Sequence, residues 1–213
     1  MSVITSFEDF NDFANTPILP STISAIAYNA FSTAVYDARL SAISLNNVVT
    51  AGDALLSGAV HMRSISALAL TSIPVSAFAY DEVLRNTKFA SATNIGNYAF
   101  YNCDALLSVD VPNATAIGNN SFAYCTSLSS CAFGSLTSLG LSAFNNCSSL
   151  TNISLGNIVS VPNYAFYNCI NLSSIIIPKT VTSTLGLKSF YGTSASLKAI
   201  FDKRLNTDTI FQS

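Results

Sequence analysis

Four cysteines have the clearest chemical potential in this sequence, because thiols can ligate metals, form disulfides or act as nucleophiles. They are Cys103, Cys125, Cys147 and Cys169, each 22 residues from the next. This even spacing predicts one position in four successive repeats and so a linear row, whereas zinc needs four ligands that converge on a tetrahedron. We therefore favour reduced, buried thiols over a disulfide between neighbours or a metal site. Cys131 falls at an inward strand position and is expected in the core.

Other residues suited to catalysis are few. His61 is the only histidine, and no candidate nucleophile or repeated acid stands near it. Acidic residues gather only at positions 8–12 and at Asp81 and Glu82, which suit solvated turns or helix ends. No glycine-rich phosphate loop follows a predicted strand. We expect no enzymatic activity, no cofactor and no bound metal.

An internal repeat positions the cysteines. The segment Ile95–Cys103 reads IGNYAFYNC and recurs in related form at residues 117–125, 139–147 and 161–169. Weaker copies extend the register, so that repeats begin at residues 26, 51, 73, 95, 117, 139, 161 and 185. A fixed period of this length is typical of a stacked solenoid.

Each repeat has a second half in which apolar residues alternate with polar ones, as at Leu106, Val109 and Val111. This alternation predicts a short strand with one face buried, and the phenylalanine half predicts a turn followed by a short helical or irregular return. The fold class is an α/β repeat: a leucine-rich-repeat solenoid of about eight coils of 22–25 residues, with a parallel sheet on one face. One hydrophobic spine should consist of Phe31, Leu56, Phe78, Phe100, Phe122, Phe144, Phe166 and Phe190.

The ends of a solenoid must be covered, because the outermost coils have no neighbour. Phe7, Phe10 and Phe13 share one face of a predicted helix. We expect an N-terminal, partly helical cap over residues 1–25, repeats over 26–201, and a C-terminal cap or tail over 202–213.

The unit I-G-x-x-A-F-x-x-C-x-x-L-x-x-I-x-I-P closely resembles the BspA-like leucine-rich repeat over about residues 26–201. The asparagine of better-known leucine-rich repeats is absent, because its positions hold Ala92, Ala114, Leu136 and Ile158. BspA-like repeats occur in surface proteins of bacteria and some protozoan parasites, where they are associated with adhesion and host-protein binding, and in viral and phage-encoded proteins. The resemblance implies a non-enzymatic module for adhesion or for protein or glycan recognition at a cell or particle surface. The alternative is a structural component of a virus or phage particle, such as a fibre, tail or capsid decoration protein.

Composition excludes several other classes of protein. Charged residues make up 9% of the chain, against roughly 25% in ordinary soluble domains. The nine Lys and Arg residues are scattered and the net charge is −2, which argues against nucleic-acid binding. No apolar run approaches the roughly 18 residues of a membrane helix, so membrane insertion is not expected. No signal peptide or anchor is visible, and we expect a virion, extracellular or cell-surface location.

Two surfaces could bind a partner. Outward strand residues predict a weakly polar sheet face, and all nine tyrosines fall in the phenylalanine halves. The candidates are Asn86, Lys88, Ser108, Asp110, Asn152, Ser174 and Ile176 on the sheet face, and Tyr98, Tyr101, Tyr124, Tyr164 and Tyr167 on the return side. Tyrosine is favoured at interfaces because it gives contact area at little entropic cost. The alternative is that these rings only shield the phenylalanine spine.

Residues 111–178 contain no Asp, Glu, Lys, Arg or His. A solvated monomer normally carries charge on its surface, although secreted and viral proteins also tolerate surfaces of Ser, Thr and Asn. We expect this segment to lie at a protein–protein interface on the return side, in a homo-oligomer or a larger assembly. A protein or a glycan is the expected partner.

Overall fold

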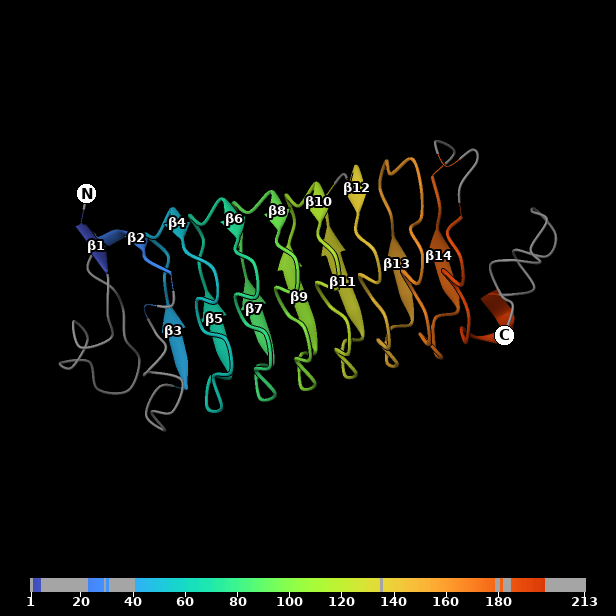
Figure 1. Ribbon diagram of the computed structural model, residues 1–213, viewed down its shortest axis with the longest axis horizontal. Helices are drawn as coiled ribbons and strands as arrows, with labels where there is room; N and C mark the ends of the chain where they lie inside the picture. Colours follow the sequence, from blue (N-terminus) through green and yellow to red (C-terminus); the bar gives the residue numbers. More distant parts are fainter. Residues whose placement is uncertain are drawn as a thin grey trace.

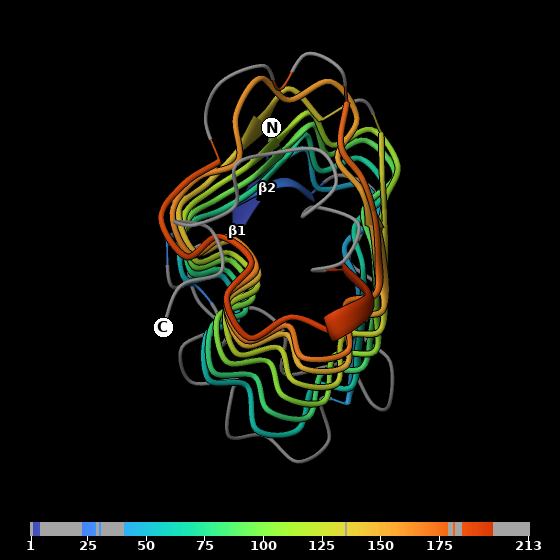
Figure 2. The same ribbon diagram turned by 90° about the vertical axis from the view of Figure 1, so that its right-hand side faces the viewer.

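The computed structural model describes residues 2–4, 23–28, 30, 41–134, 136–178, 181 and 185–197. The chain winds into a parallel β-solenoid whose coils stack along one axis (Figure 1). Seen nearly along that axis, successive coils follow almost the same path (Figure 2). The predicted leucine-rich-repeat stacking is therefore confirmed.

One strand per coil forms the main parallel sheet, which crosses the middle of Figure 1. The strands are β3 (Ala42–Ser44), β5 (Ser64–Ser66), β7 (Asn86–Lys88), β9 (Ser108–Val111), β11 (Ser130–Phe133), β13 (Asn152–Ser154) and β14 (Ser174–Ile176). One hydrogen-bonded ladder contains β3, β5, β7, β9 and β11, and a second contains β13 and β14. Each residue pairs with the residue 22 positions later, so Ile43 lies beside Ile65 and Val109 beside Cys131.

A second line of two-residue strands runs along the top of Figure 1 and was not predicted from the sequence. It contains β4 (Thr50–Ala51), β6 (Ser72–Ile73), β8 (Asn94–Ile95), β10 (Ala116–Ile117) and β12 (Ser138–Leu139). The apolar second residue is buried in β6, β8, β10 and β12, so each of these strands adds one side chain to the core. A bridge between Val161 and Leu185 continues the line.

The return from this second line to the main sheet is also paired from coil to coil. The backbone N–H groups of Tyr98, Phe100 and Asn102 donate to carbonyl oxygens of the next coil at 2.9, 2.7 and 2.9 Å. Tyr98 and Asn102 have positive φ angles of 57° and 58°. These left-handed residues turn alternate N–H groups toward the neighbouring coil, so the groups are not available for a helix.

Helix is therefore scarce, and the α/β description is corrected to a predominantly β-solenoid. Among the described residues it is confined to one turn at 195–197. The count of eight coils is also too high, because six complete turns lie between Ala51 and Leu185. The units that begin at residues 26 and 185 are described only in part.

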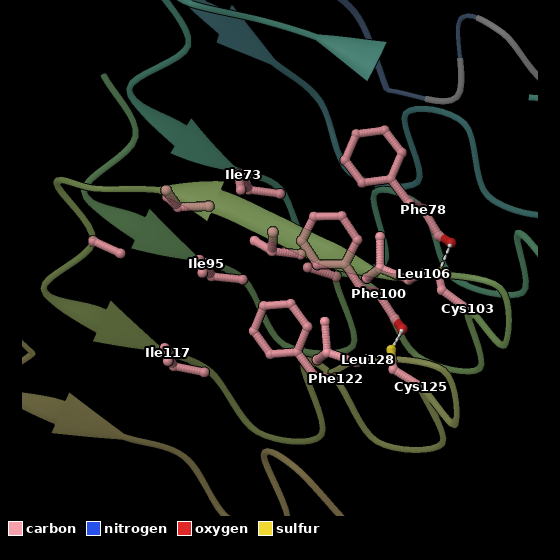
Figure 3. Close-up of a cluster of buried hydrophobic side chains, with 14 of the residues drawn as sticks. Ile73, Phe78, Ile95, Phe100, Cys103, Leu106, Ile117, Phe122, Cys125 and Leu128 are labelled. Atoms are coloured by element: carbon pink, nitrogen blue, oxygen red, sulfur yellow. Dashed lines mark hydrogen bonds between the residues drawn. The ribbon is translucent and has the colours of Figure 1, made fainter. Parts of the chain in front are cut away.

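The predicted phenylalanine spine is confirmed for its described members. Phe78, Phe100, Phe122, Phe144, Phe166 and Phe190 are all fully buried. Neighbouring rings stack with centroids 5.2–5.4 Å apart and interplanar angles of 2–21°. Leu56 is buried one coil earlier, and Phe31 lies outside the described residues. In Figure 3 this row lies between Ile73, Ile95 and Ile117 on one side and the cysteine row on the other.

The ends of the solenoid are described in less detail. Strand β1 (Ser2–Ile4) pairs in parallel with β2 (Ile23–Ile26), and β2 pairs with β4. The predicted cap helix with Phe7, Phe10 and Phe13 and the tail at 202–213 lie outside the described residues. No helix in the described part is long and apolar enough to cross a membrane.

Candidate binding surfaces

The cysteine row lies inside the solenoid, where its thiols donate hydrogen bonds to backbone carbonyl oxygens. Cys103 Sγ donates to the carbonyl oxygen of Phe78 at 3.0 Å, and Cys125 Sγ donates to that of Phe100 at 2.9 Å (Figure 3). Cys147 and Cys169 repeat this contact in the next two coils. All four thiols are free and buried, as predicted.

Burial raises the pKa of every one of the five thiols. Because only the thiolate acts as nucleophile or metal ligand, these groups, which stay protonated near neutral pH, should react slowly and bind metal weakly. Cys131 is only partly buried but packs against the core, as its strand position predicted.

Asp81 occupies the position of the cysteine row one coil before Cys103. Its side chain is 0% exposed, and neither carboxylate oxygen makes a hydrogen bond of ordinary geometry. Burial raises the pKa of this carboxyl from 3.8 to about 8, and the backbone N–H groups of Val83 and Leu84 offset only part of that rise. The prediction of a solvated turn residue is therefore wrong for Asp81, because the repeat register directs its side chain inward. Glu82 is exposed, as expected.

Groups that could hold a metal are not formed within the described segments: no three His, Cys, Asp or Glu side chains come together there. His61 is exposed in a turn. Asp104 is exposed as well, and the pKa of its carboxyl is raised by partial burial and by Glu82. These residues offer no arrangement of nucleophile, base and orienting group.

The predicted sheet-face residues are exposed and lie in two rows across the main sheet. The first row contains Asn86, Ser108, Asn152 and Ser174, and the second contains Lys88, Asp110 and Ile176. Asn86 pairs with Ser108 and Lys88 with Asp110, but the break between β11 and β13 separates them from the later strands.

A shallow depression lies over the first three strands of the main sheet, at its N-terminal end. Over β3, β5 and β7 it is lined mainly by small side chains and by two longer ones. Its lining includes Asn86 and Lys88, which are exposed, and Ala42, Ser44, Ser64 and Ser66, which are half-buried. The sheet face is thus flat and poor in large side chains that could anchor a partner.

Tyr101 is the centre of a group of four tyrosines from three coils, which we call the first tyrosine group. Its ring centroid lies 5.4, 5.7 and 5.5 Å from those of Tyr80, Tyr98 and Tyr124, edge to face in each case. Partial burial, and then the neighbouring phenols, raise the pKa of Tyr101. The structure therefore brings together three predicted binding residues and adds Tyr80, which was not predicted.

A second tyrosine group contains Tyr164, Tyr167 and Tyr191. The Tyr164 and Tyr167 centroids are 5.7 Å apart at 64°, which is close to the 5.7 Å and 65° of the Tyr98–Tyr101 pair. Tyr167 stacks on Tyr191 at 5.0 Å, and Lys188 Nζ lies 5.4 Å from the centre of the Tyr191 ring. Tyr191 was also not predicted, although it occupies the position of Tyr167 one repeat later.

The tyrosines of the two groups differ in exposure, and Tyr101, Tyr164, Tyr167 and Tyr191 are half-buried. Tyr80, Tyr98 and Tyr124 are 57%, 43% and 39% exposed. Phe144 is fully buried although the outward positions of its own coil hold Ser142, Asn145 and Asn146 instead of tyrosine. The spine therefore does not need tyrosine to shield it.

A row of asparagines does connect the coils by hydrogen bonds. It lies at a different turn from the asparagine of better-known leucine-rich repeats, whose positions here hold Ala92, Ala114, Leu136 and Ile158. Asn97 Oδ1 accepts the N–H of Asn119 at 2.7 Å, and Asn119 Oδ1 accepts the N–H of Leu141 at 2.8 Å. Asn163 repeats the contact with Leu187, and Asp53 takes the same role earlier. The sequence signal was the Asn or Asp that follows the opening Gly or Pro in four of the repeats.

Comparison with known proteins agrees with this architecture. The model of the BspA type leucine-rich repeat region matches residues 5–129 and 93–207, and it consists of 6 copies of the repeat. A leucine-rich repeat protein of T. pallidum has a similar structure, with a TM-score of 0.66 and 20% identity over 94% of this chain and 87% of that chain. A leucine-rich repeat protein from Eubacterium ventriosum gives a TM-score of 0.59 and 23% identity over 85% of this chain and 43% of that chain. No curated protein matches the sequence.

Proposed function

The chain belongs to the BspA type leucine-rich repeat family, and we propose that it is a non-enzymatic binding module for adhesion at a cell or particle surface. The observation that carries this proposal is the pair of tyrosine groups on one side of a regular solenoid, the first with three exposed rings and the second with half-buried rings. The coils hold these rings at fixed positions. A partner therefore meets a surface that is already organised before binding.

The physical advantage of such a surface is the low entropic cost of ordering it. Tyrosine has few rotatable bonds, and contacts such as Tyr101 with Tyr98 and Tyr124 restrict the rings further. The sheet face has no comparable aromatic anchor. The return side is therefore the preferred binding surface.

The experiment compares binding by the full chain and by charge-bearing variants. The immobilised protein is exposed to purified extracellular-matrix proteins, mucin, and neutral and acidic polysaccharides. We expect Tyr124→Glu and Tyr164→Glu to weaken binding of the recognised ligand about 10-fold or more, because a charge must be desolvated at the contact. Ser44→Glu on the sheet face is the matched control and should change little.

Two results would overturn the proposal. One is that the wild-type chain binds none of these ligands. The other is that Ser44→Glu reduces binding as strongly as the tyrosine variants do, while circular dichroism shows that every variant is folded.

A second candidate function is a structural component of a larger assembly, such as a virus or phage particle. It is favoured by residues 111–178, whose outward positions carry no charge. Exposed apolar side chains occur there as well, including Leu141, Val159 and Ile170 at 43%, 65% and 56% exposure. Interfaces exclude charge from their centres because its desolvation is costly. Sedimentation of the native chain is the test, since a monomer at micromolar concentration contradicts this second function.

A further inference from the structure

The two tyrosine groups repeat one geometry at a fixed separation along the solenoid. Tyr98 and Tyr101 precede Tyr164 and Tyr167 by 66 residues, which is three coils of 22. At about 4.8 Å per coil the two pairs are roughly 14 Å apart. The two pairs have nearly identical ring contacts, with Tyr98 exposed and Tyr164 half-buried.

The backbone of these turns does not explain why tyrosine is present. Tyr80, Tyr98, Tyr124 and Tyr164 have positive φ angles of 64°, 57°, 65° and 56°. A bulky residue is strained in this left-handed region, whereas Gly and Asn adopt it readily.

Other coils place Gly or Asn at six of the matching turn positions, which are Gly58, Asn102, Asn120, Asn146, Asn168 and Gly192. The remaining four matching positions hold Ala54, Ser76, Ser142 and Lys188. At the turn position of Tyr80 and Tyr124 every other described coil has Gly or Asn, so the backbone does not account for these two tyrosines, whose side chains are exposed.

Between the two groups the surface offers amides and no charge. Asn146 Nδ2 donates to Asn145 Oδ1 at 2.6 Å, and Asn168 Nδ2 donates to Asn146 Oδ1 at 3.1 Å. This chain of amides leaves the Asn145 Nδ2 hydrogens unused among the hydrogen bonds described. The charged residues nearest in sequence are Asp110 and Lys179, which have opposite signs.

Aromatic faces, amides and an absence of charge fit one class of ligand best. The face of a sugar ring presents C–H groups, which pack against the electron-rich face of a phenol, while its hydroxyls exchange hydrogen bonds with amides. An acidic polysaccharide or a nucleic acid would instead need a row of Lys and Arg. A protein partner would place its own rim charges against the uncharged strip without any counter-charge.

We propose that the two tyrosine groups and the asparagines between them bind a neutral, linear glycan chain that lies along the solenoid axis. This inference rests on the proposed binding function and specifies its ligand. One sugar ring packs on Tyr98 and Tyr101, another packs on Tyr164 and Tyr167, and Asn145 binds the hydroxyls between them.

The experiment presents the full chain to an array of neutral glucans, mannans, galactans, xylans and chito-oligosaccharides, together with heparin and hyaluronan. Titration calorimetry with a length series of the bound glycan follows. We expect the affinity to rise with length until the chain spans both groups and then to level off. Because the ligand is uncharged, the affinity should change less than about 2-fold between 50 and 500 mM salt.

Variants identify the site. Tyr101→Ala and Tyr167→Ala should each weaken binding about 10-fold, whereas Tyr101→Phe, which keeps the ring, should stay within about 3-fold. Asn145→Ala should reduce the affinity about 5-fold, and Ser44→Glu should have no effect. Circular dichroism and thermal melting check that each variant is folded.

The outcomes separate this inference from the function on which it rests. Binding to a matrix protein through the same tyrosines, with no neutral glycan bound, overturns the glycan inference and leaves the binding function standing. Binding to heparin alone, with strong salt dependence, also overturns it. No ligand of any class overturns both.

Discussion

Inward and outward rows of the same turn change in different ways along the solenoid. The inward position at Phe100 keeps phenylalanine in the next three coils. Two residues earlier, the outward position holds Tyr98, Asn120, Ser142 and Tyr164 in those same coils. The backbone is nearly constant along the outward row, with φ between 53° and 57°.

This difference shows which residues specify the fold. A side chain inside the stack must match the coils above and below it, so one residue type satisfies every coil. A side chain outside the stack is not enclosed by the coils above and below it, so several residue types occur there. We therefore expect a tyrosine at a strained outward position to affect binding, and an exception in an inward row, such as Asp81, to affect stability.

Removing one ring from the inward row should have the largest effect. We expect Phe122→Ala to destabilise the chain by about 3–5 kcal/mol, because Phe100 and Phe144 each lose a stacked neighbour and a cavity remains. Urea unfolding followed by circular dichroism gives the value. A loss below about 1 kcal/mol would mean that the rings do not stack in the core.

Replacing Asp81 by the residue of the regular coils should have the next largest effect. The pKa of this carboxyl is raised in the fold from 3.8 to about 8, so the fold favours its protonated form. The contribution of Asp81 to stability is therefore greatest below about pH 4 and should fall as the pH rises toward 8, at up to about 1.4 kcal/mol per pH unit. Asp81→Cys should remove this loss and stabilise the protein by about 2–4 kcal/mol at pH 8.

The measurement for Asp81 is urea unfolding at pH 5 and pH 8 for the wild type and for Asp81→Cys. Glu82→Gln, at the exposed neighbouring residue, is the control and should leave the pH dependence unchanged. Parallel pH profiles for wild type and Asp81→Cys would contradict the prediction.

The cysteine row should contribute less per residue. Cys125→Ala removes a weak thiol donor from the Phe100 carbonyl oxygen, which keeps the N–H of Cys103 at 3.3 Å as a second partner. We expect a loss of about 1 kcal/mol. Titration of the native protein with a thiol reagent should leave the four buried cysteines unmodified, whereas all five react in denaturant. Stoichiometric metal in the purified protein would contradict the structural role.

The smallest effect on stability is expected in the outward row. Tyr124→Asn loses one edge-to-face contact with Tyr101 but places asparagine at a φ of 65°, which it tolerates better. The lost ring contact and the relieved backbone strain should cancel, so that the free energy of unfolding changes by less than about 0.5 kcal/mol. Thermal melting tests this, and a loss above about 2 kcal/mol would show that the outward tyrosines belong to the folding core.

Some of these features follow directly from the order of residues. The repeat period, the phenylalanine spine and the buried cysteine row depend only on which residues recur every 22 positions. Stacking in register then makes equivalent residues neighbours whatever path the coil takes. Tyr80 and Tyr191 could also have been predicted as binding residues, since the register relates them to Tyr124 and Tyr167.

Other features were decided by the tertiary structure. The second line of strands and the left-handed turns depend on the path of the backbone within one coil, and this path is stabilised by hydrogen bonds to the next coil. The same path brings Tyr80, Tyr101 and Tyr124 together from three coils. By itself the sequence determined which residues stack, because burial follows the repeat. Only the folded coil decided which side chains meet on the surface, because that depends on where each turn directs them.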